Sequence, residues 1–425
     1  MKIMVIGNGG REHAICRALT SGDNPPELVI VPGNPGTAEC GTNVDCSLED
    51  IDALVALARV LDPDFVVVGP EQPLVHGVTD ALLEAKIPCC GPSQSAALLE
   101  GSKDFTREIA NLAGVPSPIY KVVTSESALR GAIEDWDGLP VIKADGLAGG
   151  KGVFLPETKA EGVNIGLGLL AGKLGDAGKT IVLEERLFGV EASLFYACDG
   201  ENALLLPHAR DHKRLLDGDQ GPNTGGMGAI SPNPLLDDKL LQEIHETCIV
   251  PTLETLKKKG IPFRGFLFGG FMLTEKGPKL LEYNVRLGDP ETQAILPRIE
   301  NGQFLELCAR IANGKLRGFK LAEQPFSTCA IVVAAAGYPE KPRKGDRISV
   351  SMAAKSSNEW LIHAATRLES GELQTSGGRV LAIVAKGTSP ENARSHAYKS
   401  LEKIQFEGMQ FRKDIGESKY LGVQS

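Results

Sequence analysis

The sequence has no apolar run that approaches the roughly 20 residues needed to cross a bilayer as a helix. Its first residues, MKIMVIGNGGREH, hold only a short apolar stretch that ends in glycines. A secretory signal peptide needs a longer apolar region and a cleavage site. We therefore expect a cytoplasmic protein that does not engage a membrane.

The sequence also lacks a paired-cysteine motif and an excess of positive charge. The nine cysteines are odd in number and form no C-x-x-C pair. The adjacent Cys89 and Cys90 lie in an apolar segment, which is typical of buried thiols in a reducing compartment. The net charge of −9 argues against a nucleic-acid partner. An anionic ligand would therefore need a local basic pocket.

The 425 residues exceed what one core normally supports, so we expect two to four domains. Through the first hundred residues, short apolar runs alternate with segments of helical periodicity. This alternation predicts a parallel sheet covered by helices, with ligands beyond the carboxyl ends of its strands. The turns Gly7–Gly10 and Gly69–Glu71 fall at such ends.

The first glycine-rich turn does not complete the dinucleotide-binding fingerprint G-x-G-x-x-G. Glu12 stands where its third glycine belongs, and the second strand ends in Val31-Pro32-Gly33 without the acidic residue that binds a ribose. A nicotinamide oxidoreductase is therefore disfavoured. A phosphate at the helix start after Gly9 and Gly10, aided by Arg11, stays plausible.

A second glycine-rich segment, KADGLAGGKG from Lys143 to Gly152, lies between two predicted strands. It is not a P-loop, because Gly152 stands where that motif requires Ser or Thr after the lysine. Its lysines and exposed backbone amides favour a hairpin flap over nucleotide phosphates. The alternative is a flexible surface hairpin.

The stretch KLLEYNVRLGDPETQ, from Lys279 to Gln293, is the most informative part of the sequence. On an extended strand, Glu282, Asn284 and Arg286 point to one face, while the apolar residues between them point into a core. Hard oxygen donors followed by a guanidinium suit a metal bound to polyphosphate. The alternative is an ordinary solvated edge strand.

Two further segments are unusually polar for a compact globular chain. In TIVLEERLFGVEAS, from Thr180 to Ser193, a bend between two strands could offer backbone groups to adenine and a carboxylate to ribose. The segment from Asp211 to Gly228 reads as a long irregular loop, and such loops are usually functional or disordered. Its start, DHKR, brings together both signs of charge, as a zwitterion or a sugar phosphate requires.

Taken in order, these segments resemble the phosphoribosylamine–glycine ligase family of the ATP-grasp ligases. The resemblance is carried by GNGGREH, GPEQPLVHGV, LEGSKDF, KADGLAGGKGV, DHKR, GPNTGGMGA and NVRLGDPETQ, and late in the chain by AAAGYP and GGRVL. It covers nearly the whole chain. Leu287 and Val190 depart from the residues that the family commonly has there.

The resemblance implies a multidomain fold of α/β and α+β type. It comprises a Rossmann-like N-terminal domain (1–102), an ATP-grasp domain (103–319, with a flap subdomain at about 120–190) and a small α+β domain (320–425). It implies ATP-dependent ligation of glycine to 5-phosphoribosylamine through glycyl phosphate, in purine biosynthesis. The implied partners are these small molecules, acting on a monomer, with Mg²⁺ or Mn²⁺ as cofactor.

The resemblance also implies roles for individual residues. The catalytic set is Arg286, Asp211, Asp289 and Lys213; the metal ligands are Glu282 and Asn284; the phosphoribosylamine site comprises Gly9, Gly10, Arg11, Gly69, Pro70 and Glu71. The ATP site comprises Lys103, Lys143, Gly146, Gly149, Gly150, Lys151, Glu184, Glu185, Leu187 and Glu191. Two rivals stay open: an ATP-grasp purine enzyme with another acid donor, and a regulatory nucleotide-binding protein without chemistry.

Overall fold

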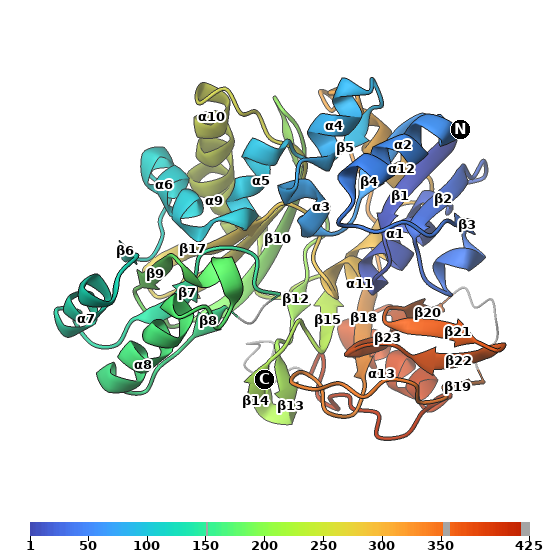
Figure 1. Cartoon of the computed structure of the whole chain (residues 1–425). Helices are drawn as coiled ribbons and strands as arrows, with labels where there is room; N and C mark the ends of the chain where they lie inside the picture. The colour runs from blue at the N-terminus through green and yellow to red at the C-terminus, as the bar shows by residue number, and fades with distance from the viewer. Residues whose placement is uncertain (150–151, 352–357, 418–425) are drawn as a thin grey trace.

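Figure 1 shows the computed structural model of the chain, which describes residues 1–149, 152–351 and 358–417. The N-terminal part is a five-stranded parallel sheet in the order β3-β2-β1-β4-β5. Its central strands are apolar and buried, as strands covered by helices on both faces require. The predicted parallel sheet is confirmed. Its strands are β1 (Lys2–Gly7), β2 (Glu27–Pro32), β3 (Thr42–Asn43), β4 (Phe65–Val68) and β5 (Cys89–Cys90).

The two glycine-bearing turns lie side by side, because β1 and β4 are neighbours in this sheet. A Cβ on Gly7 or Gly69 would come within 2.3 Å and 2.2 Å, respectively, of the Glu12 side chain, so both positions leave room for that carboxylate. The helices of this part are α1 (Gly10–Leu19), α2 (Ile51–Leu61), α3 (Glu71–Val75), α4 (Val78–Glu84), α5 (Gln94–Gly101) and α6 (Lys103–Ala113).

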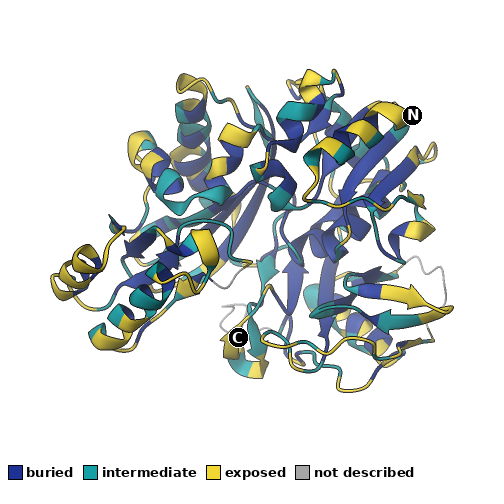
Figure 2. Ribbon diagram, in the orientation of Figure 1, coloured by how far each residue is buried: buried dark blue, intermediate teal, exposed yellow. Residues whose placement is uncertain are grey.

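A small four-stranded sheet, at the left of Figure 1, contains the glycine-rich segment that the sequence predicts to be a flap. Its order is β6-β9-β7-β8, and the predicted hairpin around the glycine-rich loop is confirmed because Lys143 pairs with Val153. Helices cover it and expose their outer faces (Figure 2). The elements are β6 (Tyr120–Val123), α7 (Glu126–Glu134), β7 (Val141–Ala144), β8 (Val153–Phe154), α8 (Lys159–Leu170) and β9 (Ile181–Glu184).

A second four-stranded sheet, ordered β11-β10-β16-β17, carries the KLLEYNVR segment. The predicted β16–β17 hairpin is confirmed, but β17 ends at Asn284, so Arg286 lies beyond the strand. Tyr283, Val285 and Leu287 are buried as predicted, whereas Leu281 is only half-buried. The elements are β10 (Val190–Asp199), β11 (Ala203–Leu205), α9 (Asp238–Ile244), α10 (Val250–Lys258), β16 (Arg264–Thr274) and β17 (Gly277–Asn284).

The polar segment 211–228 is not the irregular loop that the sequence suggests. It contains β13 (Arg214–Leu216) and β14 (Gln220–Asn223), flanked by β12 (Arg210–Asp211) and β15 (Gly228–Ser231). β15 pairs with a C-terminal strand, so this segment joins the sheet β12-β15-β18-β23-β20. The C-terminal strands of that sheet are β18 (Ser327–Ala334), β20 (Glu359–His363) and β23 (Arg379–Gly387).

The remaining α-helices and strands lie between Glu291 and Gln405. They are α11 (Glu291–Ile295), α12 (Gln303–Ala312), β19 (Ser349–Val350), β21 (Thr366–Glu369), β22 (Glu372–Thr375), α13 (Pro390–Leu401) and β24 (Ile404–Gln405). Within the described ranges, no helix is both long enough and apolar enough to cross a membrane. The domain boundaries expected from the sequence stay a prediction.

Candidate active site

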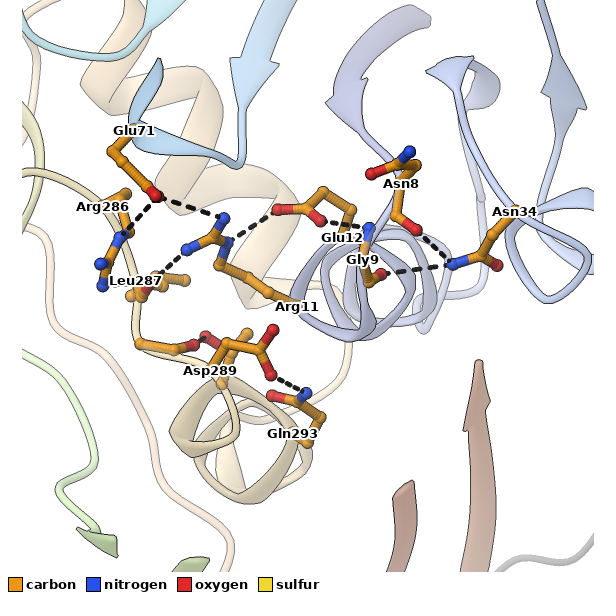
Figure 3. Close-up of polar contacts among 12 residues, drawn as sticks. Asn8, Gly9, Arg11, Glu12, Asn34, Glu71, Arg286, Leu287, Asp289 and Gln293 are labelled. Atoms are coloured by element: carbon orange, nitrogen blue, oxygen red, sulfur yellow. Dashed lines mark hydrogen bonds and ion pairs between the residues drawn. The ribbon is translucent and has the colours of Figure 1, made fainter. Parts of the chain in front are cut away.

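Arg286 lies where the N-terminal sheet meets the segment after β17, and Figure 3 shows it beside Glu71. Its guanidinium donates to Glu71 at 3.2 Å, to Glu100 at 2.6 Å and to Oδ1 of Asn284 at 3.1 Å. Glu71 begins helix α3, and burial tends to raise its pKa, but Arg286 and Arg11 lower it to about 2. Arg286 is therefore a fixed cation beside the predicted metal ligands.

Arg11 is the second guanidinium of the site, and it is buried at the start of α1. It donates to Glu12 at 2.7 Å and to the backbone oxygen of Leu287 at 3.1 Å, and it lies 3.8 Å from Glu71. Glu12 in turn accepts the backbone N–H of Gly9 at 2.6 Å. Contacts therefore tie Gly9, Arg11 and Glu71 into one network. Gly10, Gly69 and Pro70 belong to the same two turns.

Glu282 and Asn284 lie on one face at the end of β17, with Nδ2 of Asn284 3.5 Å from Oε1 of Glu282. Burial tends to raise the pKa of Glu282, but the charges of Lys213, Lys143 and Lys103 lower it to about 2. The site thus offers an ionised carboxylate and an amide oxygen, which are ligands that Mg²⁺ accepts. The residues present fit a divalent metal.

Lys143 emerges from β7 and is buried against Glu184 at the end of β9. Its Nζ lies 2.7 Å from Glu184, and burial lowers its pKa while Glu184 raises it. Glu184 also accepts from Arg107 at 2.7 Å and 3.0 Å. The predicted ATP-site residue Glu184 therefore holds Lys143. Sequence reasoning missed Arg107, which is buried on α6 and donates to the Leu280 carbonyl at 3.1 Å.

The flap loop is tied to the start of α6 through Asp145, which sequence reasoning also missed. Its Oδ1 accepts the backbone N–H groups of Lys103 at 2.5 Å and of Asp104 at 3.1 Å. The Lys103 ammonium donates to the carbonyl of Gly146 at 3.2 Å. Gly149 has a φ of 55°, which favours glycine. The predicted residues Gly150 and Lys151 lie outside the described residues.

The predicted adenine and ribose residues lie along the connection between β9 and β10. Glu185 contacts Lys279 at 3.0 Å, and Leu187 is half-buried. Glu191 on β10 contacts Lys213 at 2.6 Å. Burial tends to lower the pKa of Lys213, but Glu191, Glu282 and Asp211 raise it well above its usual range. Lys213 is therefore a cation between Glu191, the predicted ribose-binding residue, and the predicted metal ligand Glu282.

Asp289 connects the site to the C-terminal part. It accepts from Gln293 at 2.6 Å and lies 3.0 Å from the guanidinium of Arg379 on β23. Arg379 also donates to the carbonyls of Gly225 and Asp289, both at 2.5 Å. The GGRVL segment contributed to the family resemblance, but the sequence did not predict the contacts that its arginine, Arg379, makes with Asp289 and Gly225. Asp211 ends β12, and its Oδ1 is buried without a partner in the described part of the chain.

Three domain models of one family match the chain in sequence order. They are the phosphoribosylglycinamide synthetase N domain (residues 1–100), ATP-grasp (A) domain (101–292) and C domain (328–418). This chain belongs to the phosphoribosylglycinamide synthetase family. Among its relatives, the phosphoribosylamine–glycine ligase of Caldanaerobacter subterraneus subsp. tengcongensis is 43% identical over 98% of this chain and 99% of its own length. A ligase of the same name from Caulobacter vibrioides is 43% identical over 98% of each chain.

A bifunctional purine biosynthetic protein of Schizosaccharomyces pombe is also similar, with 41% identity over 97% of this chain and 53% of its own length. The crystal structure of the Thermotoga maritima phosphoribosylamine–glycine ligase has a TM-score of 0.86 at 35% identity, over 98% of this chain and 100% of that one. Biotin carboxylase from Campylobacter jejuni shares the fold alone, with a TM-score of 0.74 at 16% identity. The predicted family and three-part fold are confirmed.

Proposed function

We propose that the site activates glycine as glycyl phosphate before the amide bond forms. Family membership establishes the overall reaction: ATP-dependent ligation of glycine to 5-phosphoribosylamine, a step of purine biosynthesis. In the proposed first step, a carboxylate oxygen of glycine attacks the γ-phosphorus of ATP and ADP leaves. In the second, the uncharged amine of phosphoribosylamine attacks the acyl carbon, and phosphate leaves with the former carboxylate oxygen. The amide then loses one proton.

The crowding of charge around Glu282 carries this proposal. Lys213, Lys143 and Lys103 all act on its carboxylate, and Arg286 lies four residues further along the chain. Cations held in fixed positions stabilise a transferring phosphoryl group and its leaving group. We assign Lys103 and Lys143 to the nucleotide phosphates and Arg286 to the transferring group. Glu184 and Arg107 act on the reaction only through the position of Lys143.

ATP-grasp enzymes generally need a divalent metal such as Mg²⁺. We assign it in this chain, as Mg²⁺ or Mn²⁺, to Glu282 and Asn284. When bound there, the ion would supply charge neutralisation to the phosphates of ATP. The amide oxygen of Asn284 already accepts from Arg286, so Asn284 also fixes the position of the Arg286 guanidinium beside the proposed metal site.

We assign the other substrate groups to the residues that the family resemblance implies. Glu185 and Leu187 face adenine and Glu191 binds the ribose, beside the phosphate-binding flap glycines Gly146 and Gly149. The phosphoribosyl group lies at Gly9, Gly10 and Arg11 and the neighbouring turn of Gly69, Pro70 and Glu71. Its phosphate would meet the start of α1, where Arg11 adds positive charge. We further propose that the protein acts as a cytoplasmic monomer.

Isotope transfer tests the intermediate directly. Glycine labelled with ¹⁸O in its carboxylate is supplied with ATP and with phosphoribosylamine generated in the assay. If glycyl phosphate forms, the released inorganic phosphate carries one ¹⁸O, and ADP appears only when glycine is present. Unlabelled phosphate would contradict the proposed route. Replacing glycine with formate or bicarbonate tests the rival acid donors, and ADP formation with either one in place of glycine would favour that rival.

A further inference from the structure

Lys213 immediately precedes a hairpin that gains little support from its own sheet. Strands β13 and β14 pair only with each other in the described part of the chain, near the lower edge of the molecule in Figure 1. Every residue of β14 is exposed to solvent. Because an isolated two-stranded hairpin is marginally stable in water, contacts from elsewhere in the chain must hold this one.

A short segment after β24, residues 412–416, makes contacts of this kind. The side chain of Arg412 is fully buried, and its guanidinium donates to both carboxylate oxygens of Asp414 at 2.7 Å. The same guanidinium donates to Oδ1 of Asp219 in the hairpin turn at 2.6 Å and to the carbonyl of Arg214 on β13 at 3.3 Å. One buried cation therefore joins the hairpin to the C-terminal part of the chain.

Backbone bonds hold the turn between the two strands against the same segment. Asp414 accepts the backbone N–H of Gly218 at 2.8 Å, and Asp217 accepts that of Lys413 at 2.7 Å. Burial tends to raise the pKa of Asp414, but its bonds to Arg412 and Gly218 lower it to about 2. Asp414 therefore stays an ionised acceptor, and the turn is fixed relative to the segment.

The two neighbours of Lys213 in the chain, His212 and Arg214, are both held by segment 412–416. Besides the contact to Arg214, Nε2 of the buried His212 accepts the backbone N–H of Gly416 at 3.1 Å. Burial is the largest cause that lowers the pKa of His212 to about 3, so its ring stays neutral and can accept this bond. The backbone is thus fixed on both sides of Lys213, whose ammonium lies 2.6 Å from Glu191.

We propose that Arg412 is a positioning residue for the ligase reaction, because it holds the β13–β14 hairpin where Lys213 faces Glu282. The inference rests on the proposed function, in which Lys213 is one of the cations around that carboxylate. Arg412 contacts none of the residues assigned to a substrate, so it acts through the backbone on either side of Lys213. An arginine that only stabilised the C-terminal part of the chain would leave the Lys213 ammonium in place when it is replaced.

Steady-state kinetics of Arg412→Lys, Lys213→Met and the double variant test whether Arg412 acts through Lys213. A lysine keeps the buried charge but cannot donate to Asp414, Asp219 and the Arg214 carbonyl from one planar group. Arg412→Lys should lower kcat about tenfold, and Lys213→Met about 100-fold. In the double variant, kcat should lie within about threefold of that of Lys213→Met, because the effects of residues that act as a unit do not add.

Arg367→Lys is the matched control. Arg367 forms an exposed ion pair with Glu369, two positions later, which is the spacing of the pair that Arg412 forms. Its kcat should stay within about twofold of that of wild type. A wild-type kcat in Arg412→Lys would overturn the inference. A tenfold fall that is equal with and without Lys213 would also overturn it, because Arg412 would then act independently of that lysine.

Asp219→Asn provides a milder variant that keeps Arg412 and its pair with Asp414. The φ of Asp219 is 53°, which asparagine also adopts, so the turn is kept while the charge facing Arg412 is lost. This variant should lower kcat about threefold, and only when Lys213 is present. Wild-type kcat in the folded variant would overturn the inference, also where Arg412→Lys does not fold.

Acylation of lysines, read by mass spectrometry at mildly alkaline pH, tests the position of Lys213 without the reaction. An ammonium paired with Glu191 is a poor nucleophile, so Lys213 should react slowly relative to the exposed Lys173. In Arg412→Lys and Asp219→Asn this relative rate should rise about fivefold or more. An unchanged relative rate in both variants would overturn the inference.

The acylation measurement also separates this inference from the proposed function. If no substrate combination yields ADP, the proposed function fails. If Lys213→Met keeps the kcat of wild type, the role proposed for Lys213 fails. In either case the relative acylation rate alone decides whether Arg412 positions Lys213: a rise in the variants supports the inference, and an unchanged rate rejects it.

Discussion

Arg11 and Arg286 donate to the same backbone oxygen, that of Leu287, at 3.1 Å and 3.4 Å (Figure 3). Both also face the carboxylate of Glu71, at 3.8 Å and 3.2 Å. One guanidinium comes from the N-terminal sheet and the other from the segment after β17. Because like charges repel unless acceptors separate them, Glu71 and the Leu287 carbonyl allow both cations to occupy one site. The departure from the family at Leu287 leaves this role intact, since the backbone performs it.

Replacing Arg286 with lysine should lower kcat about 100-fold or more. A lysine keeps the charge but cannot reach Glu71, Glu100 and Asn284 from one planar group. The measurement is steady-state ADP release, with circular dichroism and thermal unfolding to verify the fold. Arg317→Lys, at an exposed position, serves as the control. A kcat within threefold of wild type would contradict the assignment of Arg286 to the transferring phosphoryl group.

Replacing Glu282 with alanine should abolish nearly all ligase turnover and leave the fold intact. The carboxylate is the only ionised ligand of the two assigned to the metal, so its loss should weaken binding of the divalent ion. ADP release is measured at saturating Mg²⁺, and Mn²⁺ binding is followed by its paramagnetic resonance signal. Glu275→Ala, in the exposed hairpin turn, is the matched control. Turnover that persists at saturating Mg²⁺ would count against the metal role.

Replacing Glu184 with alanine should destabilise the protein by about 3–5 kcal/mol, because it leaves Arg107 and Lys143 buried without their carboxylate. The free energy of unfolding is measured in urea. The KM for ATP should rise as well, since Lys143 loses the group that positions it. Glu126→Ala removes an exposed ion pair with Arg130 and should cost at most about 1 kcal/mol. Equal losses of unfolding free energy in the two variants would show that the buried ion pairs of Glu184 contribute no more to stability than the exposed pair of Glu126.

Local patterns predicted the parallel sheet, the flap hairpin and the β16–β17 hairpin, because apolar alternation and glycine turns act between neighbouring residues. The long-range pairings that support the site, and the partners Arg107 and Glu100, were not predicted by such patterns. Arg107 and Glu184 are 77 residues apart, Glu100 and Arg286 are 186 apart, and each pair forms only when separate sheets meet. Asp211 to Gly228 looked irregular because the short strand β15 draws its stability from pairing with β18 about a hundred residues later.

Glu100 makes the stability of the site depend on pH. It accepts from Arg286 at 2.6 Å and from the backbone N–H of Val285 at 2.8 Å. Burial raises its pKa from 4.5 to about 7, because Arg286 only partly replaces the lost hydration of the carboxylate. The folded protein therefore holds the proton more tightly than the unfolded chain does. The contribution of Glu100 to the stability of the folded protein is full below about pH 4.5 and is lost as the pH rises to about 7.

Glu100→Gln removes this titration and keeps an oxygen that accepts from Val285. The free energy of unfolding of the variant minus that of wild type should therefore increase between pH 5 and pH 8, by at most about 3 kcal/mol. Urea unfolding at intervals across this range measures the difference. Glu108→Gln, whose carboxylate forms an exposed ion pair with Lys259, should give a difference that barely changes with pH. A difference that is equally flat for Glu100→Gln would mean that Arg286 fully compensates the buried carboxylate, and Glu100 would then be ionised throughout this range.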